Sequence, residues 1–202
     1  MYLNKIIFPL FLILTINISA QTEKNYNTSH KSLGIKLMAD IPSFTDYEQY
    51  AYTGGFSFMY QYLYWKGASI GLYCASVYSP GFRNSGNVKY RYITNAINPM
   101  LYNGYDFRFF KKRLVQSIGV LGGYQLFMHY SGVEDPNNAI NTSYTTSFGF
   151  LNAGLMAQTH FFIKPNWAIG LSYRYHTMPL TYYYSQNIEL GIRYNFKKVE
   201  TN

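Results

Sequence analysis

The residues best suited to catalysis are His176, Ser185 and Glu189, which follow one another near the C-terminus. A histidine that takes the proton of a serine hydroxyl, with an acid to hold its ring, would activate that oxygen for acyl transfer. The simpler interpretation of His176 is an interfacial side chain satisfied by a neighbour. We therefore expect no enzyme, and we keep the Ser-His-acid group as an alternative.

Metal, redox and phosphate chemistry have little support in the sequence. Cys74 is the only cysteine, so an intrachain disulfide cannot form. No glycine-rich phosphate loop follows a strand and opens a helix. The histidines fall on different predicted elements and form no zinc-type cluster; they are His30, His129, His160 and His176. We expect no cofactor and no metal.

Seven charged residues lie on the polar side of segments whose other side is apolar. They are Lys36, Asp40, Asp106, Arg108, Arg174, Glu189 and Arg193. If these sides face a closed interior, each charge is costly unless it is paired. We expect a hydrogen-bonded ion network that holds strands together, with Glu189 between Arg174 and Lys36. A path for a solute or a proton is the alternative interpretation.

The N-terminus predicts export. Residues 1–20 carry a positive charge at Lys5, an apolar run from Ile6 to about Ile16, and the small residue Ala20 before the expected cut. The apolar run is shorter than the ~20 residues of a spanning helix, which disfavours a membrane anchor. The net charge of +8 would suit nucleic acid, but an exported protein does not meet that partner.

The composition does not suit a water-soluble surface. Charged residues make up 13% of the chain, which is about half the usual fraction, and aromatic residues make up 20%. Trp and Tyr prefer membrane interfaces, where an apolar ring meets a polar edge. A lipid-facing surface explains both values, and a secreted β-sandwich is the alternative.

Eight segments place apolar side chains at every second position, the period of a β-strand. They are residues 32–41, 55–62, 68–78, 101–110, 114–130, 148–163, 167–176 and 188–196. Two uncharged ones, 114–130 and 148–163, could be membrane helices, but their Gly and Gln residues and their neighbours favour strands. One apolar and one polar face is the pattern of a spanning barrel. We predict an all-β, transmembrane, antiparallel up-and-down β-barrel of eight strands.

The connections alternate in length. Short turns are expected at 65–67, 111–113 and 164–166, and longer links at 42–50, 79–98, 132–146 and 178–184. This alternation places both chain ends on the side of the short turns. The predicted organisation is a signal peptide at 1–20, a short N-terminal segment at 21–31, the barrel at 32–196 and a tail at 197–202.

The last predicted strand carries a pattern of its own: Glu189, Gly191, Tyr194 and Phe196 match the order polar, glycine, hydrophobic, hydrophobic at fixed spacing. This resembles the terminal assembly signal of bacterial outer-membrane barrels. The mature chain as a whole resembles, by pattern, the small OmpA/OmpX-type eight-stranded barrels. Those chains usually stop at the final aromatic residue, whereas this one continues with "KKVETN".

The resemblance implies a Gram-negative outer-membrane location and a monomer in contact with lipid and lipopolysaccharide. It also implies that the barrel assembly machinery reads Glu189, Gly191, Tyr194 and Phe196 during insertion. Some barrels of this size are lipid A deacylases, with a Ser two positions after the His; here that position is Met178.

Three cations in the longest predicted loop, Arg83, Lys89 and Arg91, could contact lipopolysaccharide phosphates or be solvated loop charges. The function we expect is structural or surface-interacting, with a filled polar interior and no wide pore. A small-solute transporter is the first alternative, and a lipid A acyl hydrolase is the second.

Overall fold

Strands account for all regular structure that the computed structural model describes, which covers residues 30–41, 54–65, 67–85, 88–110, 113–135, 140–177 and 184–196. The strands are β1 (His30–Ile41), β2 (Gly54–Trp65), β3 (Ala68–Ser85), β4 (Val88–Phe109), β5 (Leu114–Asp135), β6 (Ile140–Lys164), β7 (Trp167–Thr177) and β8 (Tyr184–Asn195). Each predicted segment falls on one of them to within a residue. The predicted signal peptide and the tail at 197–202 lie outside the described residues.

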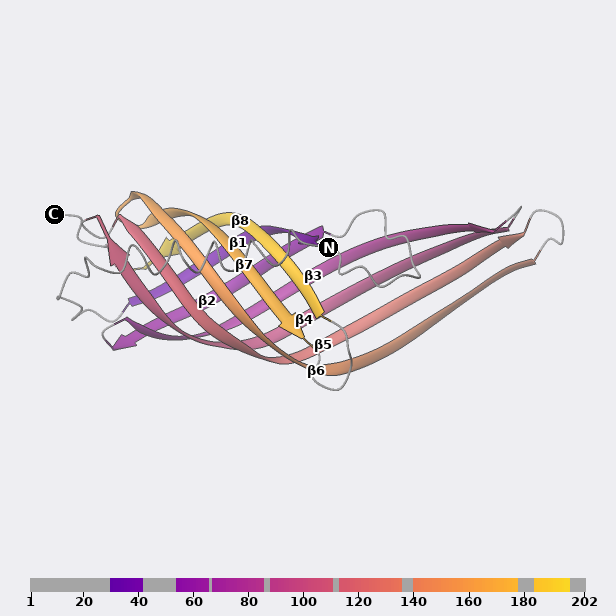
Figure 1. The fold of residues 1–202 in the computed structure, drawn as a ribbon, viewed down its shortest axis with the longest axis horizontal. Coiled ribbons are helices and arrows are strands. Elements are labelled where there is room, and N and C mark those ends of the chain that lie inside the picture. Colours follow the sequence, from indigo (N-terminus) through magenta and orange to yellow (C-terminus); the bar gives the residue numbers. More distant parts are fainter. Residues whose placement is uncertain are drawn as a thin grey trace, which may run out of the picture.

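The eight strands form one closed sheet. Each strand pairs antiparallel with its neighbours in sequence, and β1 pairs with β8 (Figure 1). Closure leaves the barrel wall without a free edge, which a bilayer core requires because backbone polar groups find no water there. The predicted eight-stranded antiparallel barrel is confirmed.

The polarity of the barrel is the reverse of that of a soluble protein. Leu37 and Leu190 are 75% and 58% exposed on the outer surface, whereas the adjacent Lys36 and Glu189 are 3% and 0% exposed. Further exposed Leu, Ile and Phe side chains surround the wall. An apolar exterior with polar residues inside is the arrangement of a transmembrane barrel.

The connections β2–β3, β4–β5 and β6–β7 are short and lie at one end of the barrel, here called the inner rim. The β2–β3 turn needs a glycine, because Gly67 has φ +101° and a Cβ there would lie 2.8 Å from the Asp106 carbonyl oxygen. Aromatic rings gather at the same rim. Trp167 packs on Tyr194 at 4.9 Å, and Tyr194 meets Phe196 at 5.5 Å, between ring centroids.

At the opposite end, β3 to β6 continue far beyond the barrel (Figure 1). The β2–β3 pairing stops at Gly54 and Tyr78, and the β6–β7 pairing stops at Ala153 and Thr177. We call the projecting residues 79–85, 88–94, 127–135 and 140–152 the sheet extension. Its outer strands, β3 and β6, each have one edge without a paired strand among the described residues.

The sheet extension corrects the prediction of long loops at 79–98 and 132–146. Residues 79–85 pair with 88–94, and residues 132–135 pair with 140–143. Turn-forming residues such as Pro80 and Gly81 suggested a loop. The β-favouring residues that follow, including Tyr90, Tyr92 and Ile93, instead continue the ladder.

Candidate functional site

Glu189 lies in the middle of the barrel interior because of the pairing of β8. It is opposite Met38 of β1 and Ser172 of β7. Its neighbours Ile188 and Leu190 are exposed on the outer surface, so the strand alternation points Glu189 inward, where it is fully buried. A carboxylate in that position needs partners inside the barrel.

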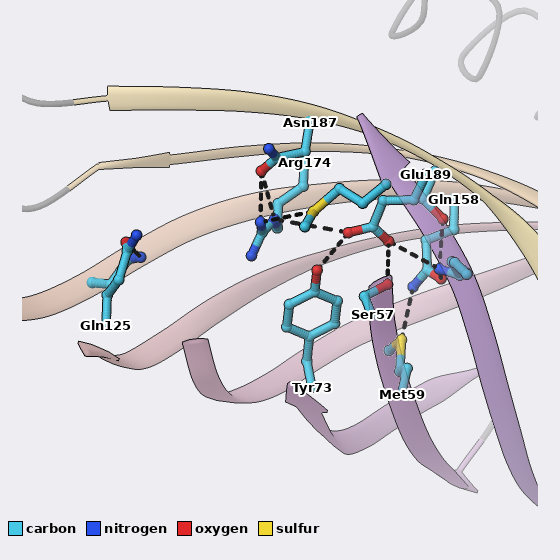
Figure 2. A network of polar contacts seen from close by, with 12 residues as sticks. Ser57, Met59, Tyr73, Gln125, Gln158, Arg174, Asn187 and Glu189 are labelled. Atoms are coloured by element: carbon cyan, nitrogen blue, oxygen red, sulfur yellow. Dashed lines mark hydrogen bonds and ion pairs between the residues drawn. The ribbon is translucent and has the colours of Figure 1, made fainter. Parts of the chain in front are cut away.

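Four side chains surround the Glu189 carboxylate (Figure 2). The Tyr73 hydroxyl donates to Oε1 at 2.5 Å, and the Ser57 hydroxyl donates to Oε2 at 3.1 Å. Lys36 Nζ lies 3.6 Å from Oε2, and Arg174 Nε lies 3.9 Å from Oε1. These partners come from β3, β2, β1 and β7, so one carboxylate connects opposite parts of the wall.

The two cations have further partners on other strands. Lys36 Nζ donates to Gln158 Oε1 at 2.7 Å and to Ser172 Oγ at 2.6 Å. Arg174 donates to Asn187 Oδ1 from Nε at 3.1 Å and from Nη2 at 2.6 Å. We call this set the Glu189 network; its members are Lys36, Ser57, Tyr73, Gln158, Ser172, Arg174, Asn187 and Glu189.

Arg174 also packs against less polar groups. Its guanidinium carbon lies 4.9 Å from the centroid of the Tyr73 ring, within cation–π range, and Nη2 lies 3.5 Å from Met38 Sδ. The remaining nitrogen, Nη1, is buried without a hydrogen-bond partner. In Figure 2, the part of the Arg174 guanidinium that carries no dashed line points away from Glu189, toward the side where Gln125 lies.

A second polar cluster lies nearer the inner rim. Asp106 Oδ2 is 3.7 Å from Arg193 Nη2, and Gln61 donates to Asp106 Oδ1 at 3.1 Å. Gln61 also donates to Ser69 Oγ at 2.8 Å, and Arg193 donates to Asn195 Oδ1 at 3.2 Å. The barrel interior therefore contains two ion-paired clusters, the Glu189 network and a second one nearer the inner rim.

Five of the seven charges predicted to face inward lie in these two clusters. Arg108 is buried as well, at 7% exposure, while the side chain of Asp40 lies outside the described residues. The described interior thus holds four buried cations and two buried anions; they are Lys36, Arg108, Arg174, Arg193, Asp106 and Glu189. Nη1 of Arg174 and Nη1 of Arg193 are buried without a hydrogen-bond partner.

The interior contains apolar side chains beside the polar ones. A buried apolar cluster lies at the level of Glu189 and beyond it, toward the sheet extension. Its members are Met38, Met59, Tyr73, Ala75, Val77, Ala96, Met100, Tyr102, Leu121 and Met156. Phe127 packs against this cluster and stacks on Phe148 at 5.1 Å between ring centroids.

Together the two kinds of side chain fill the barrel. At the level of the Glu189 network, Tyr73, Tyr102, Met156 and Arg174 are each 0–1% exposed. A side chain that lines a water-filled pore is exposed to that water. Among the described residues, these four side chains are therefore packed against neighbours rather than exposed to water at this level.

Several members of the Glu189 network were not predicted from the sequence. They are Ser57, Tyr73, Gln158, Ser172 and Asn187. For Ser57, Tyr73, Gln158 and Ser172 the signal is the inward side of an alternating segment, whereas Asn187 lies one residue before the predicted segment 188–196. Alternation shows which residues point inward, but not which of them meet across the interior.

The structure does not assemble the candidate catalytic group. His176 and Ser185 are opposite one another on β7 and β8. Glu189 lies four residues along β8 from Ser185, about 13 Å away at the strand rise, and its carboxylate is occupied by the Glu189 network. Both ring nitrogens of His176 are buried without a hydrogen-bond partner. The acid is therefore not placed to hold the histidine.

The loop cations lie elsewhere than expected. Lys89 and Arg91 are exposed residues of β4 in the sheet extension, and Arg83 is on β3 opposite Tyr90. They belong to strands rather than to a loop, because this part of the chain continues the β3–β4 ladder. The side chain of Arg83 lies outside the described residues.

The residues of the predicted assembly signal lie on β8, the strand that closes the barrel, and just after it. Gly191 is opposite Lys36, and a Cβ at Gly191 would lie 2.1 Å from the Ile35 carbonyl oxygen. Tyr194 and Phe196 join the aromatic rings of the inner rim. Packing therefore also requires glycine at position 191, because a larger residue would not fit against β1.

Within the described part of the chain, no group of three His, Cys, Asp or Glu residues could hold a metal ion. Cys74 is a free, exposed thiol. No described helix is long and apolar enough to cross a membrane.

A closed antiparallel sheet of eight strands, apolar outside and ion-paired inside, defines a small transmembrane β-barrel of OmpA/OmpX-type architecture. No family model and no curated protein matches the chain. Among solved structures, Ail, the attachment invasion locus protein of Yersinia pestis, is 16% identical, with 83% of this chain and 97% of that chain covered and a TM-score of 0.42.

OprG of Pseudomonas aeruginosa, an outer membrane protein, is 7% identical, with 85% of this chain and 98% of that chain covered and a TM-score of 0.49. The N-terminal β-barrel domain of OprF from the same organism is 14% identical, with coverage of 84% and 100% and a TM-score of 0.46. At these values the similarities carry no functional inference, and the fold assignment rests on the strand pairing of the chain itself.

Proposed function

We propose that the protein is an integral outer-membrane barrel whose sealed interior anchors the sheet extension at the cell surface for interaction with other molecules. The observation that carries this proposal is the contrast between a closed, filled barrel and a four-stranded sheet that projects from it, whose outer strands β3 and β6 have one edge each without a paired strand among the described residues. Open strand edges offer unpaired backbone groups to an extended partner segment.

The predicted signal peptide and the terminal assembly pattern support the outer membrane as the location. The apolar outer wall supports insertion into lipid. The buried layer around Glu189 supports a sealed interior and disfavours the small-solute transporter. The separation of Glu189 from His176 and Ser185 disfavours the acyl hydrolase.

Topology can be tested by labelling in a Cys74→Ser background. A membrane-impermeant maleimide should label Lys89→Cys on intact cells, because this residue lies on the sheet extension. Lys164→Cys, at the inner rim, should be labelled only after the outer membrane is permeabilised. The reverse pattern would contradict the proposed orientation.

The interaction role needs a second comparison. Cells that carry the wild type, a variant with a shortened sheet extension, or no protein would be compared for self-aggregation and for attachment to a host-cell monolayer. We expect self-aggregation or attachment to increase only in the cells that carry the wild-type protein. Equal behaviour of the wild type and the shortened variant, together with sugar-driven swelling of liposomes that contain the wild type, would instead favour the transporter.

A further inference from the structure

A basic cavity lies at the inner rim, where β6 turns into β7. It measures about 290 Å³ and is lined by Arg113, Phe161, Phe162, Ile163, Lys164 and Pro165. The Phe162 amide donates to the Arg113 carbonyl oxygen at 2.8 Å. The cavity is therefore built where the β4–β5 connection is joined to the end of β6.

The lining combines two kinds of chemistry. Arg113 and Lys164 are exposed cations, and none of the described residues that line the cavity is acidic. Phe161 and Ile163 are 51% and 58% exposed on the lipid-facing side of β6. A ligand that fits this lining has an anionic head and an apolar tail.

The cavity also lies at a membrane interface. Lys164 is opposite Trp167 in the β6–β7 register, and Trp167 belongs to the aromatic rings of the inner rim. Such rings mark the depth at which lipid headgroups begin. The cations therefore lie at headgroup depth, and the apolar side chains lie beside the acyl region.

We propose that this cavity binds the headgroup of an anionic phospholipid in the leaflet that meets the inner rim, an inference that rests on the proposed membrane location. Arg113 can donate two parallel hydrogen bonds to phosphate oxygens, and Lys164 adds a compact positive charge. The acyl chains lie along Phe161 and Ile163. A zwitterionic lipid would place its own ammonium group among the two cations, so it binds more weakly.

The test uses the full mature chain in detergent micelles. Native mass spectra would be recorded with equal amounts of dioleoyl phosphatidylglycerol or dioleoyl phosphatidylethanolamine. The variant Arg113→Gln/Lys164→Gln removes both cavity cations. A control, Lys31→Gln, removes an exposed cation outside the cavity.

We expect the wild type and the control to retain phosphatidylglycerol in preference to phosphatidylethanolamine. The cavity variant should bind it about twenty-fivefold more weakly, about fivefold for each cation. Equal retention of both lipids, or equal loss in the control, would overturn the inference. Displacement of phosphatidylglycerol by millimolar inorganic phosphate would also overturn it, because the site would then take free phosphate.

The same samples separate this inference from the proposed function. A folded barrel migrates faster on a gel when it is not boiled. Fast migration without lipid preference would remove only the lipid site. Absence of the fast form in the wild type would remove the proposed function, and the lipid site with it.

Discussion

The barrel body and the sheet extension use the same strands under opposite physical conditions. In the body every strand is paired on both sides, and the charges inside are enclosed and ion-paired. In the extension β3 and β6 each have one edge that no described strand pairs with, and side chains such as Phe148 and Lys89 are exposed. Each of the strands β3 to β6 passes from one condition to the other.

The difference follows from the surroundings of the backbone. Within a bilayer an unpaired amide or carbonyl has no water to bind, so the sheet must close. Beyond the bilayer, water satisfies an open edge, and the sheet can end as four strands. Disrupting the interior should therefore affect the folding of the body, whereas disrupting the extension should not.

The largest effect is expected from Glu189→Ala. It leaves Lys36 and Arg174 buried without an anion, which should lower the free energy of unfolding by about 3–5 kcal/mol. Urea titration of the unboiled, fast-migrating form would measure this loss. Glu189→Gln keeps the shape and should also lower the heat stability; a wild-type value for this variant would rule out the Glu189 network as a stabilising element.

An intermediate effect is expected from two adjacent glycines of β5. A Cβ at the inward Gly123 would lie 2.2 Å from the Pro99 carbonyl oxygen, whereas a Cβ at the outward Gly122 would meet no atom within 4 Å. Gly123→Ala should cost about 1–3 kcal/mol through overpacking, and Gly122→Ala should be close to neutral. Similar urea midpoints for the two variants would show that the interior is not tightly filled.

The smallest effect on folding is expected from shortening the sheet extension. Phe82 is opposite Arg91, and Val133 is opposite Thr142, so residues 83–90 and 134–141 can each be replaced by Asn-Gly, a two-residue hairpin turn. The unfolding free energy should change by less than about 0.5 kcal/mol, as for substitutions away from packed regions. A large loss would mean that body and extension fold as one unit.

The sequence was sufficient to predict the strands, their faces and the barrel. The strict alternation around Ile188, Glu189 and Leu190 can be satisfied only by a sheet with one apolar and one polar side. It also indicated Glu189 with Lys36 and Arg174, because β8 lies between β7 and β1 once the barrel closes. The same alternation of side chains predicts that Asp106 and Arg193 point inward.

The contacts between inward side chains of strands that are not neighbours could not be predicted. They depend on the stagger of the strands around the closed barrel, and the sequence alone does not specify this stagger. Tyr73 reaches Glu189 from β3, two strands away from β1, and the stagger of the closed sheet sets that contact. The extension was missed for a local reason. Pro80 and Gly81 are typical of turns, and only pairing with β4 holds this segment extended.

The central claim is that this chain closes into a sealed barrel within the outer membrane. The most direct measurement is the gel mobility of the protein from isolated outer membranes, with and without boiling. We expect faster migration of the unboiled sample, as for a closed sheet that detergent does not unfold. Identical mobility, with the protein in the soluble periplasmic fraction, would contradict the account.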